Sequence, residues 1–123
     1  MCVYVFFLGW GLPVAEAMAM SLPVVVPNHT GLTAFCTQDN SYLVPVNLNI
    51  KDKIGFYKVS PSLFGDQMRK VYNDSLHNPQ YLAKVGETAR EDMMKYYSPT
   101  RVVSLIAARM NHLAYEKRKE RTS

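Results

Sequence analysis

The chain has 123 residues, of which 48% are hydrophobic and 20% are charged, with a formal net charge of +4, and this composition excludes a disordered tail, a collagen-like chain and a disulfide-stapled scaffold. Residues 1–50 contain no Lys or Arg and only two acids, Glu16 and Asp39, whereas residues 51–123 carry all 14 basic residues against 8 acids. One globular domain is therefore expected, with a mostly interior first part and a solvated second part.

The first part of the chain alternates short apolar runs with helix-forming segments. Residues 1–8 (MCVYVFFL) predict a buried strand, because glycines end the run at under half the roughly 20 residues that a membrane-spanning helix needs and no positive residue precedes it. We therefore expect no signal peptide and no transmembrane segment. A helix is predicted at 13–20, a second strand at 23–27, a short helix from Thr30 or Gly31 to about Cys36, and a third strand at 42–46. This order predicts an α/β fold with a small parallel sheet and right-handed βαβ connections.

Three C-terminal helices are predicted after one long irregular connection at 47–59. The pairs Ser60-Pro61, Asn78-Pro79 and Ser98-Pro99 each place a capping residue before a proline, which suits the first helical position. Each helix carries an apolar stripe that should face a core, and the last stripe is longer than a three-stranded sheet covers, so part of it should be exposed. The stripes are Phe64, Met68, Val71 and Tyr72; Leu82, Val85, Ala89, Met93 and Tyr97; and Val103, Ile106, Met110 and Leu113.

Several site types have weak support in the sequence. Neither the two cysteines, Cys2 and Cys36, nor the three histidines, His29, His77 and His112, stand at the spacing of metal ligands, so no metal is expected and the cysteines should be buried free thiols. Free thiols favour a reducing compartment, the cytoplasm. The basic run EKRKER falls at a predicted helix end and contains two acids, so we favour a solvated helix end over a patch that binds nucleic acid or membrane.

One turn combines features that suit a ligand. Gly9 and Gly11 stand between the first predicted strand and the first helix, where glycine lets backbone amides approach a ligand. The helix that follows directs its positive end at the same place, which favours a phosphate or a diphosphate. Glu16 lies about one turn into this apolar helix, and its charge would need a hydrogen-bonding partner if it were buried. A pair of sugar hydroxyls is one such partner, and the alternative is a Glu at the exposed edge of its helix.

The same turn resembles a known family. Residues 9–19 (GWGLPVAEAMA) are similar to the donor-binding half of GT-B glycosyltransferases, in particular glycosyltransferase family 4. The likeness covers roughly residues 3–110. It implies a Rossmann-like half of a GT-B fold, with residues 1–123 as a partial C-terminal nucleotide-sugar-binding domain whose N-terminal acceptor domain is missing. The other matching segments are LPVV (22–25), Thr30-Gly31, YLVPV (42–46), MR (68–69), AREDM (89–93) and YSP (97–99).

The resemblance also assigns roles to single residues. It makes Glu16 the second glutamate of the family's paired-glutamate motif, which accepts hydrogen bonds from the nucleotide ribose. The family's first glutamate falls at Leu8, which cannot bond to the donor sugar, so no catalytic residue is assigned. Ala34 stands where the family often has an acid. The turn whose amides face the diphosphate and sugar, and the next strand-end loop, would consist of Gly9, Trp10, Gly11 and Leu12, and of Thr30 and Gly31.

The resemblance implies an enzyme of the hexosyltransferase class. It would be a retaining glycosyltransferase that moves a sugar from a nucleotide-sugar donor to an unknown acceptor, without a cofactor or a metal. Upstream of Met1 the family has an Arg and a Lys that neutralise the diphosphate, and these would belong to the missing part. We favour a fragment of such an enzyme over two alternatives. These are a non-catalytic, degenerate homologue that keeps the fold, and a basic interaction module that uses the C-terminal helix.

Overall fold

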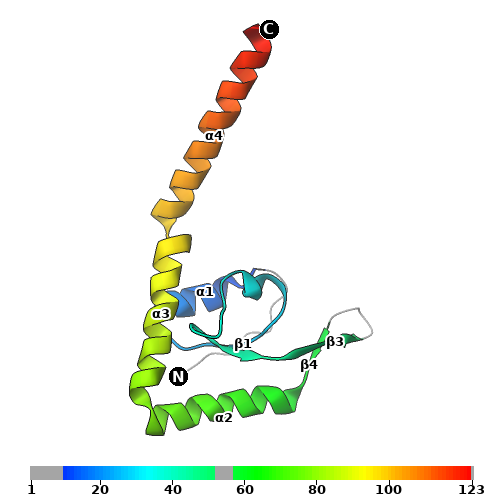
Figure 1. The fold of residues 1–123 in the computed structure, drawn as a ribbon, viewed down its shortest axis with the longest axis vertical. Coiled ribbons are helices and arrows are strands. Elements are labelled where there is room, and N and C mark those ends of the chain that lie inside the picture. Colours follow the sequence, from blue (N-terminus) through cyan, green and yellow to red (C-terminus); the bar gives the residue numbers. More distant parts are fainter. Residues whose placement is uncertain (1–9, 52–56, 123) are drawn as a thin grey trace. The chain divides into compact units, whose positions relative to one another are not determined.

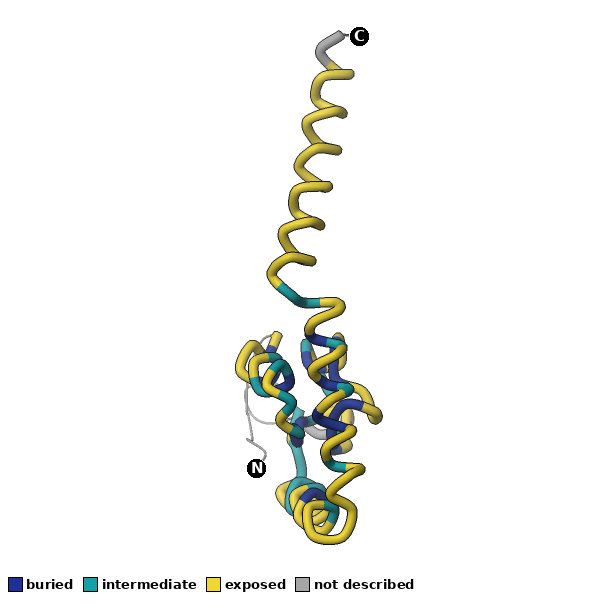
Figure 2. The backbone as a smooth tube through the Cα atoms, turned by 90° about the vertical axis from the view of Figure 1, so that its left-hand side faces the viewer, coloured by how far each residue is buried: buried dark blue, intermediate teal, exposed yellow. Residues whose placement is uncertain are grey.

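The computed structural model describes residues 10–51 and 57–122, so the strand predicted at 1–8 lies outside the described residues. The chain divides into two units, Met1–Met93 and Met94–Ser123. The first unit contains the strands and the buried core, and the second contains the last helix. Figure 2 shows that buried positions are confined to the first unit, whereas the last helix is exposed throughout its described length.

The first unit has the predicted α/β order. Helix α1 (Leu12–Ala19) precedes strand β1 (Val25–Pro27), a 3-10 helix η1 (Thr30–Ala34) follows, and β2 (Tyr42–Val44) comes next (Figure 1). β1 and β2 pair in parallel, with Val25 opposite Tyr42 and Pro27 opposite Val44. The prediction of an α/β fold with a small parallel sheet followed by three helices is confirmed.

The core forms where the valine-rich strands meet the helices. Val24, Val25 and Val26 are buried on both sides of the sheet, as expected for a strand covered on two faces. In α1, Val14 and Met18 are buried at a spacing of four residues, which is one face of a helix. One cluster joins the sheet to the two helices that follow, and it consists of Val25, Tyr42, Val44, Val71 and Val85, with Val59, Phe64 and Leu82 packed against it.

The prediction of an irregular connection at 47–59 is wrong in part. Strand β3 (Val46–Lys51) and strand β4 (Tyr57–Val59) form an antiparallel pair within it, with Val46 opposite Val59. The sequence VNLNIK alternates apolar and polar residues, which is the period of a strand. The third predicted strand, 42–46, also divides in two at Pro45, because proline has no N–H to donate to a ladder.

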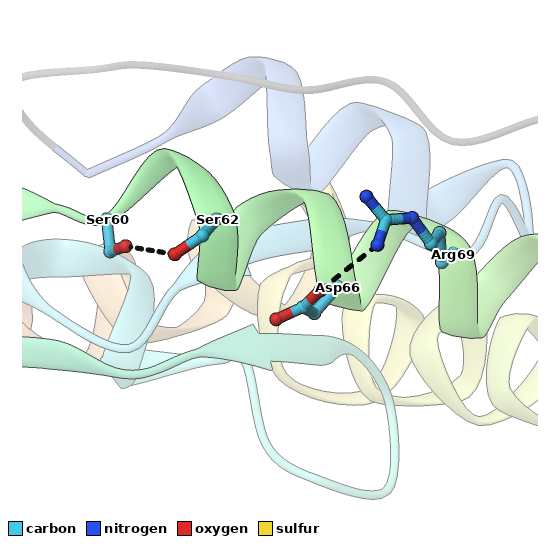
Figure 3. A network of polar contacts seen from close by, with 4 residues as sticks. All are labelled: Ser60, Ser62, Asp66 and Arg69. Atoms are coloured by element: carbon cyan, nitrogen blue, oxygen red, sulfur yellow. Dashed lines mark hydrogen bonds and ion pairs between the residues drawn. The ribbon is translucent and has the colours of Figure 1, made fainter.

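The three C-terminal helices begin at the predicted prolines. They are α2 (Pro61–His77), α3 (Pro79–Tyr97) and α4 (Pro99–Thr122). The capping prediction is wrong for Ser60, whose Oγ does not cap α2 but lies 2.8 Å from Ser62 Oγ (Figure 3). Ser98 caps α4 as expected, since its Oγ accepts a hydrogen bond from the backbone N–H of Arg101 at 3.4 Å. Figure 3 also shows the exposed ion pair between Arg69 and Asp66 on α2, at 3.5 Å.

The three apolar stripes differ in burial. On α3, Val85, Ala89 and Met93 are buried as predicted. On α2 only Val71 is buried, and Met68 and Tyr72 are exposed, so the prediction is wrong for these two residues. Since β1 and β2 are only three residues long, they cover a narrow line along α2, and side chains to one side of that line remain in solvent.

The stripe on α4 is not part of a core. All four of its residues are between 51% and 64% exposed, so the expectation of partial exposure is exceeded and the core-facing prediction is wrong for this helix. Within the described part of the chain, no helix combines the length and the hydropathy needed to cross a membrane. The four exposed residues are Val103, Ile106, Met110 and Leu113.

Candidate functional site

The backbone conformation of the turn before α1 favours glycine. Gly11 is the N-cap of α1 and has a φ of 89°, in the left-handed region that L side chains rarely adopt. It is also buried, and a Cβ placed there would lie 2.5 Å from Leu32 Cδ2 and 3.6 Å from Phe35 Cζ. The backbone conformation at Gly11 is therefore one that suits glycine, while Leu8 and Gly9 lie outside the described residues.

The structure brings two predicted segments of the site together. Leu32, which meets Gly11, belongs to η1, the turn that holds the predicted residues Thr30 and Gly31. Trp10 packs on Phe35 at the end of the same turn, with ring centroids 4.7 Å apart and planes tilted by 44°. The turn before α1 and the loop after β1 thus lie against each other.

Thr30 adopts an unusual backbone conformation. Its φ is 62°, which is uncommon for a β-branched residue and costs of order 1–3 kcal/mol. Its hydroxyl donates to the carbonyl oxygen of His29 at 2.7 Å, and its own carbonyl accepts from the hydroxyl of Thr33 at 2.8 Å. These two hydrogen bonds stabilise the first turn of η1. Ala34, at the end of η1, is exposed and supplies no acid there.

The N-terminus of α1 is not capped by a side chain. The backbone N–H groups of Val14 and Ala15 donate to the carbonyl of Gly11 at 3.0 and 3.1 Å, and no acidic residue lies in the first turn. The partial positive charge that a helix carries at this end is therefore not neutralised by the helix itself. An anion is the chemical group that this end favours.

Glu16 lies on the open face of α1. Its side chain is exposed, and it stands midway between Leu12 and Met20, which are 64% and 70% exposed at spacings of four residues. Of the two interpretations drawn from the sequence, the exposed edge is therefore the observed one, and no cost of burying a charge arises. The carboxylate lies one turn from the uncapped helix end and is accessible to a ligand.

One contact near these residues was missed by the sequence analysis. Tyr57 of β4 packs against His29 with ring centroids 4.4 Å apart and planes at 88°. The β3–β4 pair thus places an aromatic ring beside the loop after β1, where the carboxyl ends of the two parallel strands meet. His29 itself could have been considered from its place directly before Thr30, but Tyr57 stood in a segment that we expected to be irregular.

Asn40 anchors the far end of η1 to α3. Its side chain is fully buried, and its Nδ2 donates to the carbonyl of Phe35 at 2.9 Å and to Asp92 Oδ2 at 2.8 Å. Its Oδ1 accepts from the backbone N–H of Thr37 at 2.7 Å. Such a fully bonded amide fixes the loop that supports Phe35, and through Phe35 it supports Trp10.

Cys36 is a structural thiol. Burial raises its pKa to about 12, although a hydrogen bond with Ser41 acts in the opposite direction, and its Sγ lies 3.8 Å from the sulfur of Met18. The prediction of a buried free thiol is confirmed at this position. Since nucleophilic cysteines need an accessible thiolate, Cys36 is not a candidate nucleophile.

The described residues offer no metal site, because they contain no group of three or more His, Cys, Asp or Glu side chains that could hold an ion.

Comparisons with protein-family models, with curated proteins and with solved structures found no match for the chain.

Proposed function

We propose that the chain is the donor-binding part of a retaining glycosyltransferase. In this proposal the nucleoside diphosphate of a nucleotide sugar binds at the turn before α1. The observation that carries the proposal is the Gly11 turn, in which a left-handed glycine precedes a helix end with no side-chain cap and no acid in its first turn. The resemblance of residues 9–19 to the donor-binding half of family 4 glycosyltransferases supports the same ligand.

The chemistry of the ligand fits the residues in order along α1. The helix end favours the diphosphate, and the ribose then lies beside the next turn, since Glu16 is five residues beyond Gly11, or about 7.5 Å along a helix axis. The exposed carboxylate of Glu16 would accept hydrogen bonds from the ribose hydroxyls. Leu12, exposed on the same face, would contact the apolar side of the sugar.

Particular residues favour two alternative functions. Leu8 in place of the family's first glutamate favours a homologue that binds the nucleotide without transferring the sugar. The exposed apolar stripe of α4, followed by the basic run that begins at Lys117, favours an interaction module. Binding of a nucleoside diphosphate is required of the glycosyltransferase and of a homologue that keeps nucleotide binding, and it is not required of the interaction module.

Titration with uridine diphosphate and guanosine diphosphate tests the proposal. Binding is read by calorimetry and by the fluorescence of Trp10, the single tryptophan of the chain, which lies at the site. We expect Glu16→Gln to weaken binding about tenfold to a hundredfold, because a charge-assisted hydrogen bond contributes about 1.5–3 kcal/mol. The matched control is Glu87→Gln, an exposed glutamate on α3, which should bind as the unmodified chain does.

The ribose role has a separate test. A 2′-deoxyribose diphosphate should bind more weakly than its ribose counterpart to the unmodified chain, and the difference should shrink in Glu16→Gln. If the Glu16→Gln variant binds the ribose diphosphate as tightly as the unmodified chain does, Glu16 does not contact the ribose. No binding of either diphosphate by the unmodified chain would refute the proposed function.

A further inference from the structure

Helix α4 has no packing partner within its own unit. The helix has 24 residues, so it is about 36 Å long, and residues 99–120 are exposed throughout (Figure 2). In the described part of the second unit, only the last turn of α3 accompanies it. Helices in proteins depend for most of their stability on the packing of an apolar face, so α4 would gain stability from a partner.

The apolar residues of α4 include a line with the spacing of a coiled coil. Its members follow one another at steps of three, four and three residues, and each is between 51% and 64% exposed. Such alternating steps give a narrow seam that fits one partner helix, whereas a helix that packs on a larger core presents a wider apolar face. The seam consists of Val103, Ile106, Met110 and Leu113, and the same spacing continues to Lys117 and Glu120.

The charges that continue the seam disfavour a parallel pair of α4 helices. In a parallel pair each seam residue faces its own copy, so Lys117 would face Lys117 and Glu120 would face Glu120. Like charges placed opposite each other weaken an interface. In an antiparallel pair Lys117 can instead face Ile106 of the second copy, with its apolar stem on the isoleucine and its ammonium group in water.

The charges beside the seam select one antiparallel alignment. When Met110 faces Leu113 of the second copy, residues 101–122 of the two helices overlap, which is nearly the whole of α4. Arg109, one position before Met110, then lies on the same flank as Glu116 of the second copy, three positions after Leu113. Both side chains are exposed and carry opposite charges, so this alignment is complementary.

The neighbouring alignment lacks this complementarity. If the second helix is shifted by one heptad, so that Val103 faces Leu113, Arg109 of one copy meets Arg109 of the other. In the complementary alignment the opposite flank pairs Ala107 with Ala114 of the second copy, and these small side chains let the two helices approach closely.

We propose that α4 pairs with α4 of a second copy of this chain as an antiparallel two-stranded coiled coil, in which Met110 faces Leu113 and Arg109 forms an ion pair with Glu116. Because such a pair has two-fold symmetry, each of these contacts occurs twice. The interface goes beyond the proposed function, since it uses no residue of the nucleotide site. It gives the exposed seam of α4 a partner whose chemistry is fixed by the chain itself.

The test is a charge exchange measured by sedimentation equilibrium on the full chain. We expect the unmodified chain to pass from monomer to dimer as its concentration rises from about 1 to about 300 μM, as for a short interface. Arg109→Glu and Glu116→Arg should each weaken dimerisation about tenfold or more, because two like-charge contacts replace two ion pairs. An equal mixture of the two variants should restore the dimer, since every Arg then meets a Glu. Arg101→Glu, on the side of α4 away from the seam, is the matched control and should change nothing.

The apolar part of the seam has its own readout. Leu113→Ala should weaken the dimer about tenfold, because each dimer loses two seam leucines, whereas Leu105→Ala, an exposed leucine off the seam, should not weaken it. A dimer that neither single charge reversal weakens, or that the mixture does not restore, would overturn the alignment. A chain that stays monomeric at every concentration would overturn the proposal, and binding of that monomer to vesicles of anionic lipid would assign the seam to a membrane surface instead.

Discussion

The same substitution at two helical glycines should have opposite effects on stability. Gly65 on α2 and Gly86 on α3 both lie inside helices, where alanine is the better helix former by about 0.8–1.0 kcal/mol. A Cβ at Gly65 would meet no atom within 4 Å beyond its chain neighbours and the nearby backbone of α2. A Cβ at Gly86 would clash with the carbonyl oxygen of Ser21. We therefore expect Gly65→Ala to stabilise the chain and Gly86→Ala to destabilise it.

The magnitudes follow from these surroundings. Gly65→Ala should raise the free energy of unfolding by up to about 1 kcal/mol, which is the gain in helix propensity. At Gly86 the clashing atom belongs to the backbone of Ser21, which cannot rotate away as a flexible side chain can. Overpacking costs typically 1–3 kcal/mol, and we expect the upper end of that range. After the helix gain is subtracted, Gly86→Ala should destabilise the chain by about 2 kcal/mol.

Urea unfolding followed by circular dichroism measures both variants. The free energy of unfolding falls by about 2 kcal/mol per molar urea for a chain of this size. With this slope, the unfolding midpoint of Gly86→Ala should lie about 1 M below that of the unmodified chain, and the midpoint of Gly65→Ala slightly above it. The slope itself should not change, since neither variant alters the unfolded chain greatly. A midpoint for Gly86→Ala equal to or above that of the unmodified chain would show that α3 does not pack on Ser21, and the packing described for the first unit would then be wrong.

Two further predictions concern buried polar groups of the first unit. Tyr42→Phe removes the hydrogen bond from the phenol to Asp74 Oδ2, 2.9 Å away, and should cost about 1 kcal/mol in urea unfolding; combined with Asp74→Ala its effect should shrink, and full additivity would mean that the two groups do not interact. Because burial raises the pKa of Cys36 to about 12, iodoacetamide at pH 8 should label it far more slowly in the folded chain than in urea, as read by peptide mass spectrometry. The neutral thiol stabilises the fold below about pH 9, and this contribution should be lost as the pH rises from about 9 to 12. Equal labelling rates in the folded and the unfolded chain, or a free energy of unfolding that stays constant from pH 9 to 12, would contradict the burial of Cys36.

The helices after residue 60 could be predicted closely because their starts are encoded locally. Helices α2, α3 and α4 each begin at the proline of a Ser-Pro or Asn-Pro pair, since proline has no N–H to lose at the first helical position and its φ is already helical. The parallel pairing of β1 and β2 could also be predicted, because a short helix lies between the two apolar runs, and strands joined through a helix usually pair in parallel. Local chemistry decides where these helices start, whereas the strand pairing follows from the order of the elements along the chain.

The features that could not be predicted depend on contacts between distant segments. The pattern VNLNIK has the period of a strand, but its partner at Tyr57–Val59 is only three residues long and gives a weak signal by itself. The contact of His29 with Tyr57 joins residues 28 positions apart, and no local rule places them together. For α2, the narrow sheet rather than the helical period decides that Met68 stays in solvent.

The candidate site depends on how α1 is held at its two ends. At the first end Gly11, with its φ of 89°, packs closely on the side chain of Leu32. At the other end the guanidinium of Arg90 donates to the carbonyl of Ala19, the last residue of α1, where a cation also complements the helix dipole. Figure 1 shows α1 beside α3, the helix that carries Arg90. With both ends fixed and Val14 and Met18 buried, the rotation of α1 is set, and Glu16 is left facing solvent. The orientation of the carboxylate is therefore a property of the core packing, and the contacts of Gly11, Val14, Met18 and Arg90 determine which way Glu16 faces.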